Sequence, residues 1–165
     1  MLQIRPATID DADTIWKAEV ATAQVPGRLL SRPDELELSS FEAKLRLLSD
    51  SGGYVVAVDG GRVCGHAVLE PMSLASRSHV LSLTIVVHPG QTGRGIGTAL
   101  LTHLQGWARS KPEVRKVELL VRATNAGARR LYERFGFVEE GRFRERVRLP
   151  NGEFVDDIAM AWFPR

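Results

Sequence analysis

Four glycines, at positions 90, 93, 95 and 97, follow an apolar segment at residues 80–87 and surround the start of a helical pattern at Ile96. Glycine weakens the start of a helix unless the backbone must turn tightly or another group must approach it closely. The residues before the glycines favour a buried strand. Apolar side chains recur afterwards at helical spacing, at Ile96, Leu100, Leu101, Leu104 and Trp107. The sequence therefore predicts a strand, a tight turn and a helix N-terminus.

Two common phosphate-binding loops do not fit this turn. A P-loop requires Lys directly after its last glycine, whereas Ile96 follows Gly95. A dinucleotide fingerprint requires one more glycine, three residues on, where Thr98 or Leu100 stands. What remains is a helix N-terminus, whose unpaired N–H groups and positive dipole end can bind a phosphate. A tight turn without a ligand is the alternative.

Periodicity and turn residues predict eleven elements in the order β-α-α-β-β-β-α-β-α-β-β. The strands are expected near residues 2–5, 54–58, 62–69, 80–87, 114–121, from 137 onward and 154–162, and the helices near 8–24, 41–50, 96–107 and 125–135. Asp59-Gly60-Gly61 is typical of a hairpin turn, and Gly136 of a helix C-terminus. Hairpins and helix crossovers together predict an α/β fold in one domain, residues 2–165, with a central mixed sheet of about seven strands and about four helices.

Composition narrows the classes of partner. A net charge of +2 in 165 residues favours neither a nucleic acid nor a membrane surface. The apolar run at residues 80–87 is too short to span a bilayer, and the N-terminus resembles no signal peptide. The single cysteine, Cys64, permits no internal disulfide and reads as a buried structural thiol, so we expect a cytoplasmic protein. Arginines at 142, 144, 146 and 148 indicate either a solvated strand face or a local anion site.

The second informative segment is Asn125–Phe137, which reads Asn-x-x-Ala-x-x-Leu-Tyr-x-x-x-Gly-Phe. On its own it indicates a helix with Asn125 as its cap and Tyr132 as a core residue. Together with the glycine turn it resembles the two signatures of the GNAT family of acetyl-CoA-dependent N-acetyltransferases. The resemblance extends from Ile4 to Trp162, because the predicted element order also matches that of the GNAT fold.

The resemblance implies acetyl-CoA as cosubstrate and no metal. The pyrophosphate would lie on the backbone N–H groups of the turn, and the pantetheine arm would pair with the preceding strand like an added strand. The cofactor-binding residues would then be Ile85, Val86, Val87, Gly93, Arg94, Gly95, Ile96, Gly97, Thr98 and Asn125. The family usually has Arg or Gln directly before the first glycine of the loop. Thr92 stands there instead, and Arg94 could supply part of the missing charge.

The implied reaction is direct attack of a primary amine on the thioester. Tyr132 would act as general acid for the leaving thiolate. An ammonium must first lose a proton, and Glu70 is our first choice of general base; Glu37, His79, His88 and Asp156 are the other candidates. His66 reads as a satisfied core histidine.

The resemblance places the acceptor pocket between residues 25–40 and 145–155. The acceptor would be a free amino acid, a small amine or a protein N-terminus, and a homodimer is possible. A protein of this fold that senses acetyl-CoA without turnover is the first alternative. A phosphate- or nucleotide-binding protein unrelated to coenzyme A is the second.

Overall fold

A computed structural model describes all 165 residues of the chain. The seven strands are β1 (Gln3–Pro6), β2 (Tyr54–Asp59), β3 (Arg62–Pro71), β4 (Val80–Val87), β5 (Lys116–Arg122), β6 (Val138–Arg148) and β7 (Phe154–Trp162). The four helices are α1 (Ala12–Ala23), α2 (Leu38–Leu48), α3 (Ile96–Arg109) and α4 (Ala126–Arg134). No helix combines the length and apolar character needed to cross a membrane.

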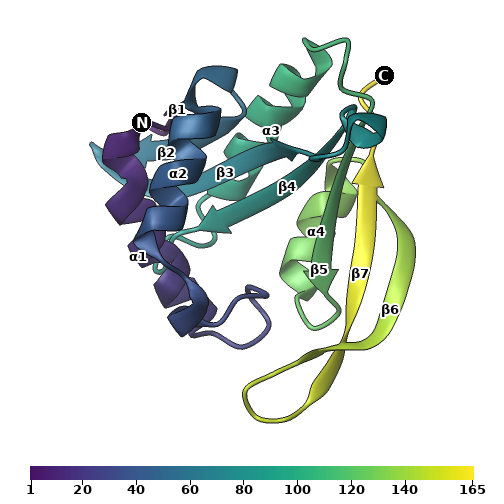
Figure 1. Cartoon of the computed structure of the whole chain (residues 1–165). Helices are drawn as coiled ribbons and strands as arrows, with labels where there is room; N and C mark the ends of the chain where they lie inside the picture. The colour runs from purple at the N-terminus through teal and green to yellow at the C-terminus, as the bar shows by residue number, and fades with distance from the viewer.

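All seven strands form one sheet in the order β1-β2-β3-β4-β5-β7-β6. Every neighbouring pair is antiparallel except β4 and β5, which are parallel. The parallel pairing covers only Val80–Ser82 of β4 and Lys116–Glu118 of β5. Beyond these residues the two strands diverge, as Figure 1 shows between the teal and green arrows. The sheet is therefore open at its centre.

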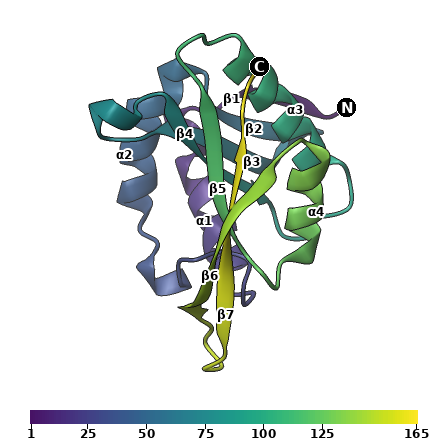
Figure 2. The ribbon, with the colours of Figure 1, turned by 90° about the vertical axis from the view of Figure 1, so that its right-hand side faces the viewer.

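Helices cover both faces of this sheet. Figure 2 shows α1 and α2 on one side and α3 and α4 on the other. Side chains alternate along each strand, so β2 sends Val55 and Ala57 into the core under α3 and sends Tyr54 and Val56 into the core under α1 and α2. All four of these residues are buried. A continuous apolar run is what a strand covered on both faces requires.

The predicted element order, mixed sheet and helix number are confirmed. The ranges predicted for β4 and β7 agree to the residue. Three starts were wrong. Helix α2 begins at Leu38 rather than near residue 41. The chain enters α1 through a 3₁₀ turn at Ile9–Asp11, so the helix begins at Ala12 and Thr8 caps the turn. Val114 is buried but lies in a turn, where its N–H donates to the Lys111 carbonyl, so β5 begins only at Lys116.

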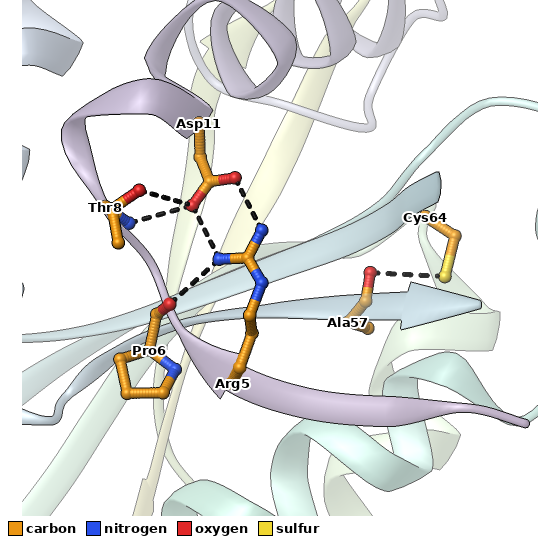
Figure 3. Close-up of polar contacts among 6 residues, drawn as sticks. All are labelled: Arg5, Pro6, Thr8, Asp11, Ala57 and Cys64. Atoms are coloured by element: carbon orange, nitrogen blue, oxygen red, sulfur yellow. Dashed lines mark hydrogen bonds and ion pairs between the residues drawn. The ribbon is translucent and has the colours of Figure 1, made fainter. Parts of the chain in front are cut away.

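Cys64 has a structural role, as expected. It is the extra residue at a bulge between β2 and β3, where Ala57 pairs with Gly65 and Val58 pairs with Val63. Its thiol donates to the Ala57 carbonyl at 3.3 Å, and burial raises the pKa of the thiol (Figure 3). A protonated, buried thiol is a poor nucleophile.

An ion pair ties β1 to the start of α1. Both terminal nitrogens of Arg5 donate to the Asp11 carboxylate at 2.8 Å, and the Thr8 N–H donates to the same group at 2.8 Å (Figure 3). Burial opposes ionisation of Asp11, but these hydrogen bonds outweigh it and lower the pKa of the carboxyl. This contact fixes where α1 leaves the edge strand.

We expect Asp11→Asn to lower the free energy of unfolding by about 1–2 kcal/mol at pH 7, because it leaves a hydrogen-bonded guanidinium without its charge partner. The lowered pKa means that this stabilisation is complete above the unfolded-state value of about 3.9 and is lost as the pH falls below it. Urea unfolding of both proteins at pH 7 and pH 3 should show the difference shrinking in acid. Asp13→Asn, which removes an exposed pair with Lys17 on the same helix, is the control and should cost under about 0.5 kcal/mol.

Candidate active site

A cleft of about 1690 Å³ occupies the opening between β4 and β5. It is larger than the roughly 300–1,000 Å³ of a typical small-ligand pocket, so it has room for two reactants. Its lining comes from both diverging strands, the glycine turn, α4 and the segment between α1 and α2. Of the site residues expected from the sequence, ten line it: Ile85, Val86, Val87, Gly93, Gly95, Ile96, Gly97, Thr98, Asn125 and Tyr132.

The glycine turn needs glycine for two different reasons. Gly90, Gly93 and Gly95 have φ angles of 79°, 77° and 76°, a conformation that residues with a Cβ rarely adopt. Gly97 is instead part of α3, and a Cβ there would lie 2.9 Å from the Leu131 side chain of α4. The turn therefore serves the path of the chain, and Gly97 leaves room for the Leu131 side chain of α4 beside the start of α3.

The start of α3 presents unpaired N–H groups. The first intrahelical bond runs from the Ala99 N–H to the Gly95 carbonyl at 3.0 Å. The N–H groups of Ile96, Gly97 and Thr98 precede that bond and have no intrahelical partner. These residues line the cleft, so the helix N-terminus directs donors and its positive dipole end toward it.

Arg94 does not face the cleft. Its guanidinium pairs with Asp59, the last residue of β2, at 2.6 Å and with the Gln91 side chain. Arg94 therefore does not take the place, in this structure, of the Arg or Gln that the family has at the position of Thr92. The anion-binding capacity of the turn rests on its backbone.

Strand β4 has an open edge along the cleft. Leu83–Val87 pair with β3 on one side but have no partner on the β5 side, because the parallel pairing stops at Ser82. Ile85, Val86 and Val87 belong to this open stretch. An extended ligand with amide groups can pair with such an edge as an added strand does.

Tyr132 lies on the α4 side of the opening. Burial raises the pKa of its phenol to about 12, although the positive charge of Arg122 opposes the shift. The Tyr132 hydroxyl forms no hydrogen bond within the chain and is not sealed from solvent. Because Tyr132 lines the cleft, its hydroxyl can be reached from there. A phenol with this pKa keeps its proton near pH 7 and can donate it.

Asn125 has the predicted capping role. Its side-chain oxygen accepts a hydrogen bond from the Ala128 N–H at 3.3 Å at the start of α4. Gly136, with a φ of 85°, follows the C-terminal end of the same helix as expected. These two residues set the length of α4 and hence the place of Tyr132 near its end.

Glu70 is less well placed than the sequence suggested. Its carboxylate pairs with Lys44 of α2 at 3.3 Å, and it is not among the residues that line the cleft, so its role as a base stays a prediction. Asp156 is bound to Arg142 and to the Glu145 N–H in the β6–β7 hairpin. Of the remaining candidates, Glu37 lines the cleft, whereas His79 and His88 do not.

Sequence reasoning missed Glu19. This residue of α1 lines the cleft, and its carboxylate contacts the buried His66 at 2.8 Å. His66 in turn contacts His88 at 2.8 Å, so the expectation of a satisfied core histidine is confirmed. The available signal was position, because Glu19 follows the buried Ile15 by one helical turn and therefore lies on the buried face of α1.

Arg122 lines the cleft and belongs to a buried ion pair that the sequence did not predict. Arg122 at the end of β5 pairs with Asp157 of β7 at 3.2 Å and donates to the Leu120 carbonyl at 2.6 Å. In the arginine run, Arg142 pairs with Asp156, while Arg146 lines the cleft and covers the Phe143 ring at 4.2 Å. No group of three or more His, Cys, Asp or Glu side chains is arranged to hold a metal.

A model of the acetyltransferase (GNAT) family matches residues 17–137, which is more than half of the chain. The chain therefore belongs to the GNAT family of acetyltransferases, as the two sequence signatures indicated.

The chain is also similar to two relatives and one solved structure. The chain is 34% identical over 107 residues to the L-amino acid N-acetyltransferase AaaT of Escherichia coli, and the match covers 65% of each chain. It is 30% identical over 138 residues to the N-alpha-acetyltransferase RimI of Mycobacterium tuberculosis, covering 75% of this chain and 85% of that one. The putative acetyltransferase YncA of Salmonella typhimurium, solved with its cofactor acetyl-CoA, superposes with a TM-score of 0.89 at 20% identity, covering 100% of this chain and 95% of that one. That likeness confirms the predicted fold.

The two tyrosines of the chain provide a direct check of the site's electrostatics. Burial raises the pKa of Tyr132 to about 12, and burial together with the charge of Glu19 raises the pKa of Tyr54. We therefore expect almost no tyrosinate absorbance from the folded protein at pH 10, where an ordinary tyrosine is half ionised. The same protein unfolded in guanidinium should show about half ionisation. Half ionisation of the folded protein at pH 10 would contradict the buried placement of both phenols.

Proposed function

We propose that this protein is an acetyl-CoA-dependent N-acetyltransferase that acts on a primary amine. The observation that carries the proposal is the opening between β4 and β5, with unpaired N–H groups of α3 at one end and the Tyr132 hydroxyl beside it. Acetyl-CoA offers matching chemistry, since a pyrophosphate suits the helix N-terminus and the amides of the pantetheine arm suit an open strand edge.

The proposed reaction is direct transfer. The amine nitrogen attacks the thioester carbonyl carbon, the carbon–sulfur bond breaks, and the amide product forms without a covalent enzyme intermediate. Tyr132 gives its phenolic proton to the departing sulfur, a kind of assistance worth roughly 10²–10⁴-fold in rate. An unpaired N–H on the open stretch of β4 is suited to stabilise the oxyanion.

We further propose that the acceptor is a free amino acid, a small amine or a protein N-terminus. The names of the two relatives cover the first and the last of these classes. Arg28 and Arg146 line the cleft and suit a substrate carboxylate, whereas Glu35 and Glu37 line it as well and suit a second ammonium. We place the protein in the cytoplasm, because its one cysteine is buried and unpaired and needs no oxidising compartment.

We expect Tyr132→Phe to lower kcat by about 100- to 1,000-fold and to change the Kd for acetyl-CoA by less than about 3-fold. The substitution removes the proton donor but keeps the ring that packs against Phe137. Release of coenzyme A over a panel of L-amino acids, alkyl diamines and short peptides, with products identified by mass, measures the effect.

An unchanged kcat in this variant would remove Tyr132 from the mechanism. Wild-type protein that binds acetyl-CoA but acetylates nothing on the panel would instead support a sensor of the same fold.

Ligand-dependent stability separates coenzyme A from other phosphates. At one hundred times its Kd, acetyl-CoA should stabilise the fold by about 2.7 kcal/mol, or roughly 5–10 °C in Tm, whereas ATP and NAD should not. Gly93→Ala should weaken the binding of acetyl-CoA at least about 10-fold, because a Cβ would crowd the backbone that receives the pyrophosphate. Gly61→Ala is the matched control, since Gly61 has a φ of 78° against 77° for Gly93, and a Cβ meets open space at both. Equal stabilisation by ATP would count against a coenzyme A site.

A further inference from the structure

Three side chains form a buried polar chain that leads away from the cleft. Glu19 of α1 lines the cleft, and its Oε1 lies 2.8 Å from Nε2 of His66 on β3. Nδ1 of His66 lies 2.8 Å from Nε2 of His88, the residue after β4. The His66 side chain is 1% exposed and that of Glu19 is 14% exposed. Only Glu19 reaches the cleft, so the two histidines act on any ligand there through its carboxylate.

The direction of the hydrogen bonds follows from the chemistry of the groups. A carboxylate accepts and cannot donate, so we assign a hydrogen to Nε2 of His66. Burial and the neighbouring His66 lower the pKa of His88 to about 4, so His88 is neutral near pH 7. His88 also forms a backbone hydrogen bond at Val63, so both of its ring nitrogens are engaged. The contact with His88 holds the His66 ring, and His66 in turn holds the carboxylate of Glu19.

The second oxygen of Glu19 remains free. Oε2 forms no hydrogen bond within the chain and is not sealed from solvent, and the residue to which it belongs lines the cleft. A carboxylate fixed through one oxygen and open through the other is arranged as a proton acceptor. If the chain served only to attach α1 to the sheet, the free oxygen would not need to open into the cleft.

We propose that Glu19 is the general base that takes a proton from the acceptor ammonium, and that His66 and His88 are positioning residues that hold its carboxylate. This inference rests on the proposed function, which supplies the amine and the thioester. It names a base on α1 in place of the strand-end carboxylate Glu70.

The proton balance is complete with this assignment. An ammonium loses two protons on becoming an amide. Oε2 of Glu19 takes the first, which frees the lone pair that attacks the thioester carbon, and later releases it to water. The second leaves the nitrogen as the tetrahedral intermediate collapses, while Tyr132 protonates the thiolate and recovers a proton. The products are the amide, coenzyme A as its thiol and one released proton.

The position of Glu19 complements that of Tyr132. Glu19 approaches the opening from the face covered by α1 and α2, whereas Tyr132 belongs to the core on the α3 and α4 face. Base and acid thus stand on opposite sides of the sheet, with the opening between β4 and β5 between them. An amine entering from the α1 side meets the base before it reaches the thioester.

The other charged and titratable groups around Glu19 leave it the best placed base. Tyr54 of β2 lines the cleft and is close enough for Glu19 to raise its pKa, so it is protonated near pH 7 and cannot act as a base. Glu70 at the end of β3 is already paired with Lys44 of α2. His66 and His88 are buried behind the carboxylate.

The test measures kcat/KM from pH 6 to pH 10 for wild type and Glu19→Gln. The acceptor is the amine of the amino acid, diamine and peptide panel on which wild type releases coenzyme A fastest. We expect Glu19→Gln to lose at least 100-fold at pH 7 with little change in the Kd for acetyl-CoA. The loss in kcat/KM relative to wild type should shrink steadily toward pH 10. An amine with a pKa of about 10 is then increasingly deprotonated before it binds, so it depends less on a base. A structural defect would lower the rate by one factor at every pH.

Three further variants make the result specific. Glu19→Asp keeps a carboxylate and should recover part of the lost rate, which also covers a failure of Glu19→Gln to fold. His66→Gln should lower kcat by about 10-fold, and this loss should also shrink as the pH rises. The substitution leaves the carboxylate of Glu19 in place but less well held. Asp13→Asn, an exposed carboxylate on the same helix, is the matched control and should stay within about 2-fold of wild type.

The outcomes distinguish a wrong base assignment from a wrong proposed function. Active wild type with a Glu19→Gln loss below about 3-fold, or with a loss independent of pH, overturns the base assignment and leaves the proposed function standing. A pH-dependent loss in Glu70→Gln with none in Glu19→Gln overturns it in favour of Glu70. Wild type that is inactive on every amine overturns the proposed function and this inference together.

Discussion

The early end of the parallel pairing between β4 and β5 is the constraint on which the rest of the structure depends. Only three residue pairs join the strands before they separate. Strand β5 remains ordered because it pairs with β7 along Val117–Arg122, and β4 remains ordered because it pairs with β3 along its length. The sheet can therefore lose hydrogen bonds at its centre without losing its two halves. The unpaired backbone groups that result would be costly in a sealed interior, so the opening must face a ligand or water.

Most of the fold could be predicted because its signals are local. The glycines at 90, 93 and 95 indicate a tight turn, and the structure has left-handed backbone angles there. The apolar run at 80–87 indicates a covered strand, which is β4. The polar chain from Glu19 to His88 could not be predicted in the same way. Its members are separated by 47 and 22 positions, and only the sheet register and the docking of α1 bring them together. The same holds for Arg122 and Asp157, which meet through the pairing of β5 with β7.

Glu70 shows that residue type and strand position do not determine what surrounds a carboxylate. A carboxylate at the end of a central strand is a reasonable candidate for a base. In the structure, however, Glu70 forms an ion pair with Lys44 of α2. Whether a carboxylate is free or paired depends on the helix packed above it, and that packing is not visible in the strand's own sequence. Glu19 illustrates the converse. It reads as one more polar residue of α1 until the helix is placed over His66.

Tertiary packing also explains why the glycine turn is more than an anion cradle. Gly97 lets α3 approach Leu131 of α4 closely, and Tyr132 is the next residue along α4. A Cβ at position 97 would lie 2.9 Å from the Leu131 side chain, so that side chain would have to shift. The segment proposed to bind the phosphates thus meets the helix that carries Tyr132 at one side-chain contact. A turn that only had to reverse the chain would need glycine at its left-handed positions, but it would not need glycine inside the helix that follows.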